Sequence, residues 1–248
     1  MKHIISLLLL LLSCNLYAQT LSQKGQYALH LNGENEYLFI QENGGGLLNT
    51  GNELTIEAHI RVSDTEGYVA IANKHWCLGR GGSYHFGIRD GKLTFVWTEI
   101  GHCDYHASVI TTREVIKKNR WTSVAVTFIN GEVRLFVNGK IQKADKLGNI
   151  EKLNDTEAPI LIGSYRKLSG DYLSFFSGEI NEFRLWNKAR TNIEIRRYRK
   201  KSIVKSDNSL LLNLTFEDRE VQNYTSYKFD INCIGKKCSN PSNMILKK

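Results

Sequence analysis

The segment WTSVAVTFINGEVRLFVNGK, residues 121–140, is the stretch that decides the fold. Hydrophobic and polar residues alternate on both sides of Asn130-Gly131, and Asn138-Gly139 follows the second run. Such two-residue alternation is typical of a strand that is buried on one face. Asn-Gly pairs tolerate the positive φ angles that tight hairpin turns require. The segment therefore predicts antiparallel strands over 122–128 and 132–137, joined by a tight turn.

The same alternation recurs on both sides of this hairpin in the sequence. It is found in Leu54–Val62 and in Lys92–Trp97, and Asp90-Gly91 supplies a turn before the second run. Apolar residues at every second position from Leu210 to Phe216 predict one more core strand. Short strands separated by tight turns favour an antiparallel sandwich over parallel βαβ units.

Helical signals are confined to Thr191–Lys201, where Thr191 and Glu194 are spaced as a capping box. This segment is also where the positive charge gathers. The chain has 33 Lys and Arg against 25 Asp and Glu, a formal charge of +8. The basic patch comprises Arg196, Arg197, Arg199, Lys200 and Lys201. Such a block either binds an acidic partner through a field that salt screens, or is a solvated face that keeps the protein soluble; we favour the second reading.

The first residues predict export. Lys2 and His3 precede an apolar run, and Ala18-Gln19 fits a signal-peptidase site. The run is too short for a transmembrane helix, and no later stretch is long and apolar enough. Residues 1–18 are therefore predicted as a signal peptide of a secreted, cell-surface or periplasmic protein. A lipid anchor at Cys14 is the alternative, although Leu12 fits a lipoprotein box poorly.

The mature chain is predicted to hold one domain. It contains only two prolines and no low-complexity linker, and its length suits a single β-sandwich. The boundaries that we expect are 19–218 for the domain and 219–248 for a C-terminal extension that packs on the domain or trails from it.

Removal of the signal peptide leaves four of the five cysteines, and an even number in an exported chain predicts two disulfides. Of the three pairings, Cys77 with Cys103 and Cys233 with Cys238 is the one that we favour. The region around the first pair could instead bind zinc, and we prefer the disulfide because the usual ligand spacings of structural zinc sites are absent. The Cys- and His-rich stretch that raises this alternative comprises His75, Trp76, Cys77, His85, His102, Cys103 and His106, with the imidazoles and thiolates as the possible ligands.

Four segments, taken in order, resemble the laminin-G-like family of concanavalin A-like lectin and glucanase jelly rolls. They are ALHLNGENEYL (28–38), LTIEAHI (54–60), the hairpin at 121–140, and ILIG (160–163) followed by FSGEINEFRLW (176–186). The hairpin is similar to the most specific signature of the family. The resemblance implies an all-β jelly-roll sandwich of two antiparallel sheets, with a short helix at the basic segment. It also implies rim loops that carry ligands and sometimes calcium.

The positions that the resemblance assigns to calcium are Asn32, Asn35, Glu36 and Asn181. Three of these four are amides where the family has carboxylates. Calcium prefers charged oxygen ligands, so a calcium site here is expected to be weak. No other cofactor is indicated.

Related jelly rolls include glycoside hydrolases, which commonly place two carboxylates on one strand as E-x-D-x-E. Here Glu179 is followed by Asn181 and Phe183, so the second carboxylate of that motif is missing. Strand alternation also predicts that Glu182 points away from the face of Glu179. We therefore predict that the protein is not an enzyme.

The most favourable binding site in the sequence lies between residues 73 and 106. Tryptophan and tyrosine combine an apolar face with a polar tip, which suits a half-wet sugar site. The predicted ligand-binding residues, placed on rim loops, are Trp76, Arg80, Tyr84, His102 and Tyr105, whereas Trp97 is predicted to be core. The leading hypothesis is an exported, non-catalytic module that binds carbohydrate or mediates adhesion. The alternative is a protein-interaction or structural module that uses the basic patch, with an extracellular protein as partner; nothing indicates nucleic acid.

Overall fold

The computed structural model describes residues 27–75, 81–99, 107–167, 169–199, 201, 208–216, 220–235 and 244–246. The predicted signal peptide with Cys14 lies outside these residues, and its cleavage stays a prediction. The same holds for Lys200 of the basic patch, for three of the four cysteines of the predicted disulfides and for most of the predicted rim residues. The residues concerned are Trp76, Cys77, Arg80, His102, Cys103, Tyr105 and Cys238. Cys233 lies in β18 (Asp230–Ile234), and both disulfide pairings stay predictions.

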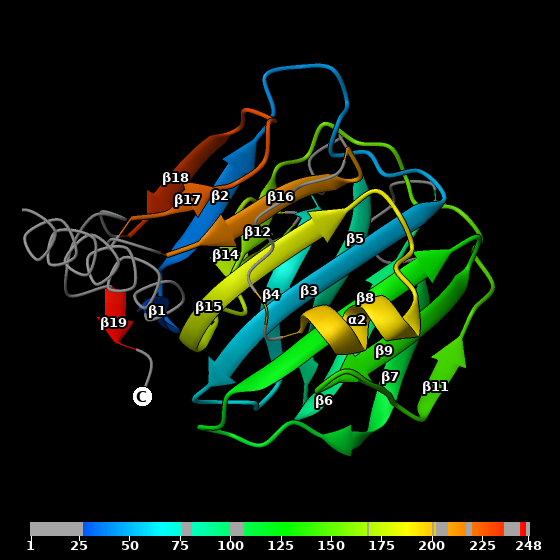
Figure 1. Cartoon of the computed structure of the whole chain (residues 1–248), viewed down its shortest axis with the longest axis horizontal. Coiled ribbons are helices and arrows are strands. Elements are labelled where there is room, and N and C mark those ends of the chain that lie inside the picture. The colour runs from blue at the N-terminus through cyan, green and yellow to red at the C-terminus, as the bar shows by residue number, and fades with distance from the viewer. Residues whose placement is uncertain are drawn as a thin grey trace, which may run out of the picture.

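Two antiparallel sheets pack face to face (Figure 1). Sheet A has nine strands, in the order β10 (Lys140–Ile141), β9 (Glu132–Val137), β8 (Thr122–Ile129), β3 (Glu53–Val62), β15 (Ser177–Trp186), β1 (Tyr27–Asn32) and β19 (Met244–Leu246), with β16 (Leu210–Thr215) also paired to β15 and β17 (Gln222–Asn223) paired to β16. Sheet B has eight, in the order β11 (Ala144–Leu147), β7 (Ser108–Val115), β6 (Lys92–Trp97), β5 (Gly82–Arg89), β4 (Tyr68–His75), β12 (Ile160–Ile162), β2 (Tyr37–Gln41) and β18 (Asp230–Ile234). The predicted all-β sandwich of two antiparallel sheets is confirmed.

The core lies between the sheets and is built from the predicted alternation. Ile56 and Ile60 of β3 and Phe95 of β6 are completely buried in it. Trp97 is also core, as predicted, with 1% of its surface exposed. Its indole Nε1 donates a hydrogen bond of 2.9 Å to the carbonyl oxygen of Ile150, so the one polar atom of the ring is satisfied.

The three predicted turns have the backbone that tight hairpins need. Asp90, Asn130 and Asn138 have φ angles of 48°, 47° and 51°, and the glycine after each is also at positive φ. They connect β5 to β6, β8 to β9, and β9 to β10. The residue types that tolerate this backbone therefore fix the register of these hairpins.

A β-bulge in β15 overturns one prediction. Ile180 pairs with Ile60 of β3, but Glu182 pairs with His59, so Asn181 is an extra residue in the strand. The bulge shifts the alternation by one position. Glu179 and Glu182 therefore both lie on the outer face of sheet A, and the expectation that they face opposite sides was wrong.

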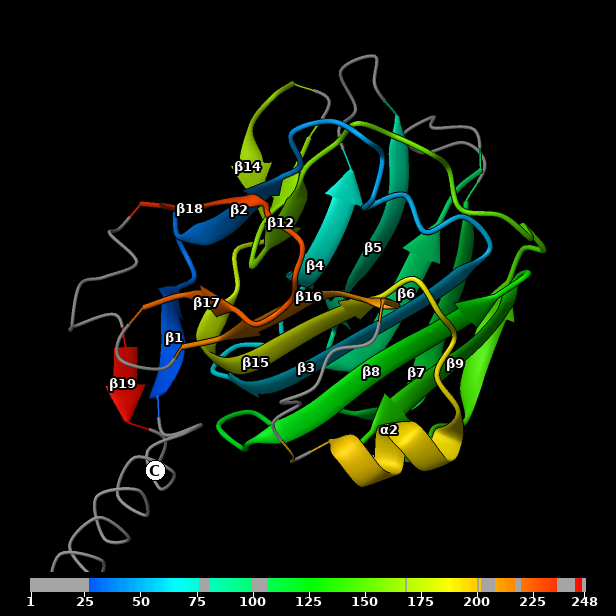
Figure 2. The same ribbon diagram turned by 45° about the horizontal axis from the view of Figure 1, so that its top comes forward.

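The helix α2 (Asn192–Tyr198) lies on the outer side of sheet A, across β8 and β9 (Figures 1 and 2). Its N-cap is Thr191, and the capping box with Glu194 is present as predicted. Ile195 holds the helix to the sheet by packing against Ala125 and Phe136. No helix among the described residues is long and apolar enough to cross a bilayer.

The described part of the C-terminal extension adds strands to both sheets. β18 pairs with β2 at the edge of sheet B, and β19 pairs with β1 at the edge of sheet A. β17 continues sheet A beside β16. The extension thus covers strand edges that would otherwise be open, while the predicted boundary at residue 218 stays a prediction.

Candidate functional site

The outer face of sheet B carries a group of aromatic and polar side chains that we call the Tyr-His cluster. It consists of Tyr68, Asn73, His75, His85 and Tyr165. In β5 the core takes Tyr84, Phe86 and Ile88, so strand alternation turns His85 outward. Tyr165 comes from a different element, the hairpin of β13 (Tyr165–Arg166) and β14 (Tyr172–Leu173), which lies beside β4.

Asn73 organises this cluster through its side-chain amide. Its Oδ1 accepts a hydrogen bond of 3.1 Å from the Tyr68 hydroxyl and lies 3.1 Å from Nδ1 of His85. Its Nδ2 donates to the carbonyl oxygen of Ser164 at 2.6 Å. The amide is completely buried, and these bonds fix the orientation of the two rings beside it.

The rings of the cluster are in mutual contact. The centroid of His85 lies 4.2 Å from that of His75 and 4.8 Å from that of Tyr165. Tyr68, His85 and Tyr165 are half-buried, so each keeps part of its surface open to solvent. The cluster therefore presents aromatic surface that is preorganised rather than mobile.

Burial keeps both histidines of the cluster neutral at neutral pH. It lowers the pKa of His75 to about 4. It also lowers the pKa of His85 well below the usual value, and electrostatic repulsion from His75 when protonated and from Arg89 lowers it further. A neutral imidazole offers one donor and one acceptor. The cluster can thus stack on an apolar face and exchange hydrogen bonds, but it brings no charge of its own to a ligand.

The β13–β14 hairpin extends the aromatic surface along sheet B. Tyr172 stacks on Tyr37 with 4.8 Å between ring centroids, and the Arg166 guanidinium lies 5.5 Å from the centre of the Tyr172 ring. Tyr172 and Arg166 are both half-buried.

Four of the predicted ligand residues fall in the β4–β5 and β6–β7 connections, whose flanking strand ends meet at one end of sheet B. His75 at the end of β4 pairs with Gly82 at the start of β5, and Trp97 at the end of β6 pairs with Ser108 at the start of β7. Tyr84 and Trp97 are paired in turn, so the β4–β5 and β6–β7 connections start from neighbouring positions. Their residues Trp76, Arg80, His102 and Tyr105 lie outside the described residues, and their roles stay predictions.

The prediction that Tyr84, the fifth ligand residue, lies on a rim loop was wrong. Its side chain lies in the core, with 1% of the residue exposed and its ring 6.0 Å from that of Phe95. β5 starts at Gly82, two residues before Tyr84, so this tyrosine belongs to a strand rather than to a rim loop. The alternation from Tyr84 to Ile88 was the signal that could have identified His85 as the outward residue instead.

The four residues assigned to calcium do not converge. Asn32 organises its own turn, because its Oδ1 accepts hydrogen bonds from the backbone nitrogens of Glu34 and Asn35 at 2.9 and 3.2 Å. The carboxylate of Glu36 accepts from the backbone nitrogen of Asn32 at 2.9 Å. Asn32 pairs with Ser177, so Asn181 lies about 13 Å further along β15, given the usual rise per strand residue.

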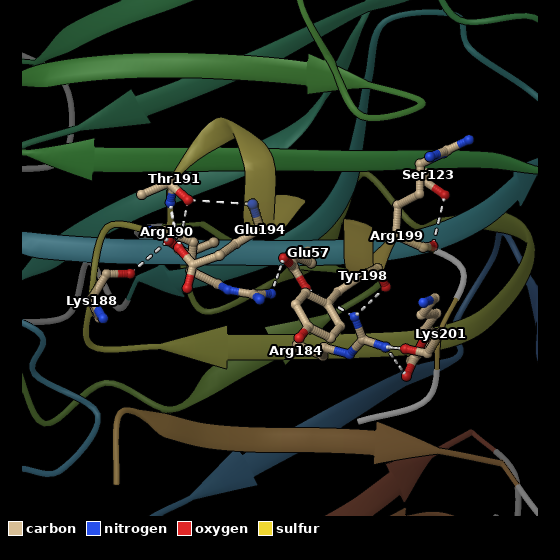
Figure 3. Close-up of polar contacts among 12 residues, drawn as sticks. Glu57, Ser123, Arg184, Lys188, Arg190, Thr191, Glu194, Tyr198, Arg199 and Lys201 are labelled. Carbon is tan, nitrogen blue, oxygen red and sulfur yellow. Dashed lines mark hydrogen bonds and ion pairs between the residues drawn. The ribbon is translucent and has the colours of Figure 1, made fainter. Parts of the chain in front are cut away.

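A network of ion pairs lies between α2 and sheet A (Figure 3). Arg184 of β15, only 2% exposed, donates to Glu57 of β3 at 3.0 Å and to Glu182. It also donates to the carbonyl oxygens of Tyr198, at 3.1 Å, and Lys201. Arg190 donates to the second carboxylate oxygen of Glu57 at 2.7 Å.

Beside this network lies a pocket of about 330 Å³, counted with its open mouth. Glu57, Glu182 and Arg184 line its polar side, and Phe136 and Ile195 line its apolar side. The carboxylates of Glu57 and Glu182 in the pocket accept hydrogen bonds from arginines. That of Glu179 accepts one from Nε of Arg61 at 2.7 Å. The face with these carboxylates therefore has the character of a structural ion-pair network rather than of a hydrolase site.

The residues of the basic patch differ in their exposure to solvent. Arg196, Arg197 and Lys201 are exposed, whereas Arg199 is half-buried and its guanidinium donates to the carbonyl oxygen of Arg196 at 2.8 Å. Arg199 is therefore held close to the helix rather than extended into solvent.

Comparison with known proteins identifies the family. Residues 32–196, more than half of the chain, match the family described as the concanavalin A-like lectin/glucanases superfamily. The chain belongs to this superfamily. Among curated proteins, none matches the sequence.

Solved structures share this superfamily fold at low sequence identity. A Bacteroides ovatus protein that is proposed to bind carbohydrate matches with a TM-score of 0.59 and 18% identity; the match covers 87% of this chain and 62% of that protein. A heptameric, SAP-like pentraxin from Limulus polyphemus matches with a TM-score of 0.56 and 15% identity, over 87% of this chain and 98% of the pentraxin. The CBM40 of a Ruminococcus gnavus IT-sialidase, solved with α2,3-sialyllactose, matches with a TM-score of 0.53 and 14% identity, over 70% of this chain and 98% of the module. This chain therefore spans less than two thirds of the Bacteroides ovatus protein.

Proposed function

We propose that this protein is a non-catalytic module that binds carbohydrate on the outer face of sheet B, at the Tyr-His cluster. The observation that carries the proposal is the arrangement of Tyr68, His85 and Tyr165 around the buried amide of Asn73. These rings are half-buried and preorganised, and they combine stacking surface with neutral hydrogen-bonding groups. Sugars have the complementary chemistry, apolar C–H faces edged by hydroxyl groups.

Two further observations support a binding role. The superfamily includes lectins, and the CBM40 with this fold was solved with a sialylated sugar. The predicted rim residues, including Trp76 and Tyr105, follow strands that end beside the cluster, so they would extend the same surface. With the predicted signal peptide, the module would act outside the cell, in secreted, cell-surface or periplasmic form.

The absence of catalysis is proposed from the chemistry of the carboxylates. Hydrolysis of a glycosidic bond needs one carboxyl group as acid and a second as base or nucleophile. Glu179 and Glu182 share a face after the bulge, but Arg61 binds the first and Arg184 binds the second. Turnover of any polysaccharide by the purified chain would contradict this part of the proposal.

The binding proposal is tested by substitution of the cluster. We expect Tyr165→Ala and His85→Gln each to weaken binding to a glycan identified on an array by about tenfold, which corresponds to about 1.4 kcal/mol. Tyr224→Ala is the matched control, because Tyr224 is an exposed tyrosine outside the cluster. Affinities from calorimetry are compared only for variants whose circular dichroism spectra and melting temperatures match the wild type.

If both cluster variants keep their fold and bind the glycan as tightly as the wild type, the ligand does not bind at the Tyr-His cluster. Trp76→Ala separates the two parts of the surface, since loss of binding there alone would place the ligand on the rim loops. Binding through an uncharged cluster is also expected to change little with ionic strength, unlike binding through the basic patch.

A further inference from the structure

The outward side of α2 combines basic and apolar side chains. We call it the α2 face and define it by Ile193, Arg196, Arg197, Lys201 and the neighbouring Ile141 of β10. Ile195 points to the sheet, and residues at positions 193, 196 and 197 of a helix share the opposite side. The sequence alone favours a solvated face here, whereas the structure shows exposed isoleucines among these basic side chains.

The cations of the α2 face have no acidic partner among the residues that the structure describes. Arg196, Arg197 and Lys201 are exposed, and none of them forms an ion pair with an acidic residue in the described part of the chain. The acids beneath the helix are already engaged, because Glu57 and Glu182 bind Arg184 and Arg190, and Glu194 closes the capping box. The positive field of this face is therefore directed outward to solvent.

The α2 face is also held rigidly. Figure 3 shows the Arg184 guanidinium between Glu57 and the carbonyl oxygens of Tyr198 and Lys201, which fixes the C-terminal end of the helix to sheet A. The backbone nitrogen of Arg190 donates to the Thr55 hydroxyl at 2.9 Å, which fixes the approach to its N-terminal end. The basic side chains are thus presented on a fixed support.

Two isoleucines project among these cations. Ile193 is 71% exposed and Ile141 is 50% exposed. Ile141 pairs with Phe136, whose side chain packs against the underside of α2, so Ile141 faces the same side of sheet A as the helix. Each exposed isoleucine leaves apolar surface in contact with water, which is unfavourable. A face that served only to keep the protein soluble would gain nothing from isoleucines at these positions.

We propose that the α2 face binds the surface of an anionic membrane, with Arg196, Arg197 and Lys201 at the phosphate headgroups and the isoleucine tips at the acyl boundary. Each cation near such a surface gains from the negative potential, and aliphatic tips gain only where hydrocarbon is within reach. A hydrated polyanion would satisfy the arginines but not the isoleucines. This inference does not depend on the glycan site on sheet B.

The test is co-sedimentation of the full chain with vesicles of phosphatidylcholine, with and without phosphatidylglycerol. We expect binding only to the anionic vesicles, and a decline as salt rises from about 50 mM to about 500 mM. Removal of two charges in R196Q/R197Q should weaken the partition coefficient roughly 25-fold, at about fivefold for each cation. Ile193→Ser should weaken it several-fold at every salt concentration. The charge-matched control is K92Q/K152Q, whose two lysines are exposed and lie outside the α2 face.

Three outcomes would overturn the proposal. The first is the absence of wild-type binding to anionic vesicles, and the second is an equal loss in the control pair. The third is binding to heparin that matches vesicle binding and is unaffected by Ile193→Ser, which would assign the surface to a soluble polyanion. A loss of glycan binding in the sheet B variants, with vesicle binding intact, shows that the two sites fail independently.

Discussion

His75 and His85 owe their neutral state to burial against each other and against Tyr165. Both rings pack against neighbours on the outer face of sheet B, so protonation would place a charge where packing has removed much of the surrounding water. Both histidines therefore become protonated at a lower pH in the folded protein than in the unfolded chain.

This difference predicts acid sensitivity. The unfolded chain binds a proton at His75 near pH 6.5, whereas the folded chain binds it only near pH 4, so stability is lost as the pH falls between these values. From pH 6.5 to pH 5 we expect His75 alone to lower the free energy of unfolding by about 1 to 2 kcal/mol. The pKa of His85 is lowered too, so it acts in the same direction.

Urea unfolding at several pH values measures the effect. H75Q/H85Q should show a flatter dependence on pH over this interval, whatever its stability at pH 7. A double variant with the same slope as the wild type would show that other groups cause the acid sensitivity.

The sequence predicted single residues unevenly. Trp97 was predicted to be core because its strand alternates without interruption, and it is. Tyr84 was misplaced because the strand starts earlier than its flanking glycines suggest. The contribution of Tyr165 could not be predicted, since a hairpin of two-residue strands has no periodicity and only the packing of the chain brings it to β4.

At the level of the elements, α2 depends on its N-terminal cap. The Thr191 hydroxyl accepts a hydrogen bond from the backbone nitrogen of Glu194 at 3.3 Å, and Glu194 accepts one from the backbone nitrogen of Thr191 at 2.8 Å. These two bonds satisfy donors that a helix end leaves open.

Loss of the cap should loosen the helix without unfolding the sandwich. We expect Thr191→Ala to cost about 1 kcal/mol and to speed the amide hydrogen exchange of Ile195 and Tyr198, because the first turn then lacks its side-chain acceptor. Asn192→Ala is the matched control, as Asn192 is exposed and has no capping role. Equal exchange in the two variants would contradict a capping role for Thr191.

Strand positions were predictable to different degrees for a physical reason. β6 and β9 begin and end at the predicted residues, because each is a hairpin arm bounded by turn residues. The bulge in β15 left no such mark, since Asn181 is compatible with either face of a strand. It is set by the pairing with β3, which a local pattern does not record.

On the scale of the whole molecule, the C-terminal extension completes the sandwich. β18 pairs with β2 over five residues, including the partners of the buried Leu38 and Ile40. Without it, β2 would be an open edge with apolar neighbours.

Deletion of residues 220–248 is therefore expected to leave a chain that associates through β2. Size-exclusion chromatography with light scattering should show dimers or larger species, together with a lower melting temperature than that of the full chain. A monomeric truncated protein that melts like the wild type would show that the extension is dispensable for the sandwich.

The Tyr-His cluster and the α2 face lie on opposite outer sides of the sandwich, with two sheets about 10 Å apart between them. A body attached through one side necessarily turns its other side away from the attachment. The stand-off and the direction of presentation are then set by the sandwich itself, without any hinge or spacer. Occupancy of one side leaves the other sterically open, so this architecture suits the bridging of two different surfaces.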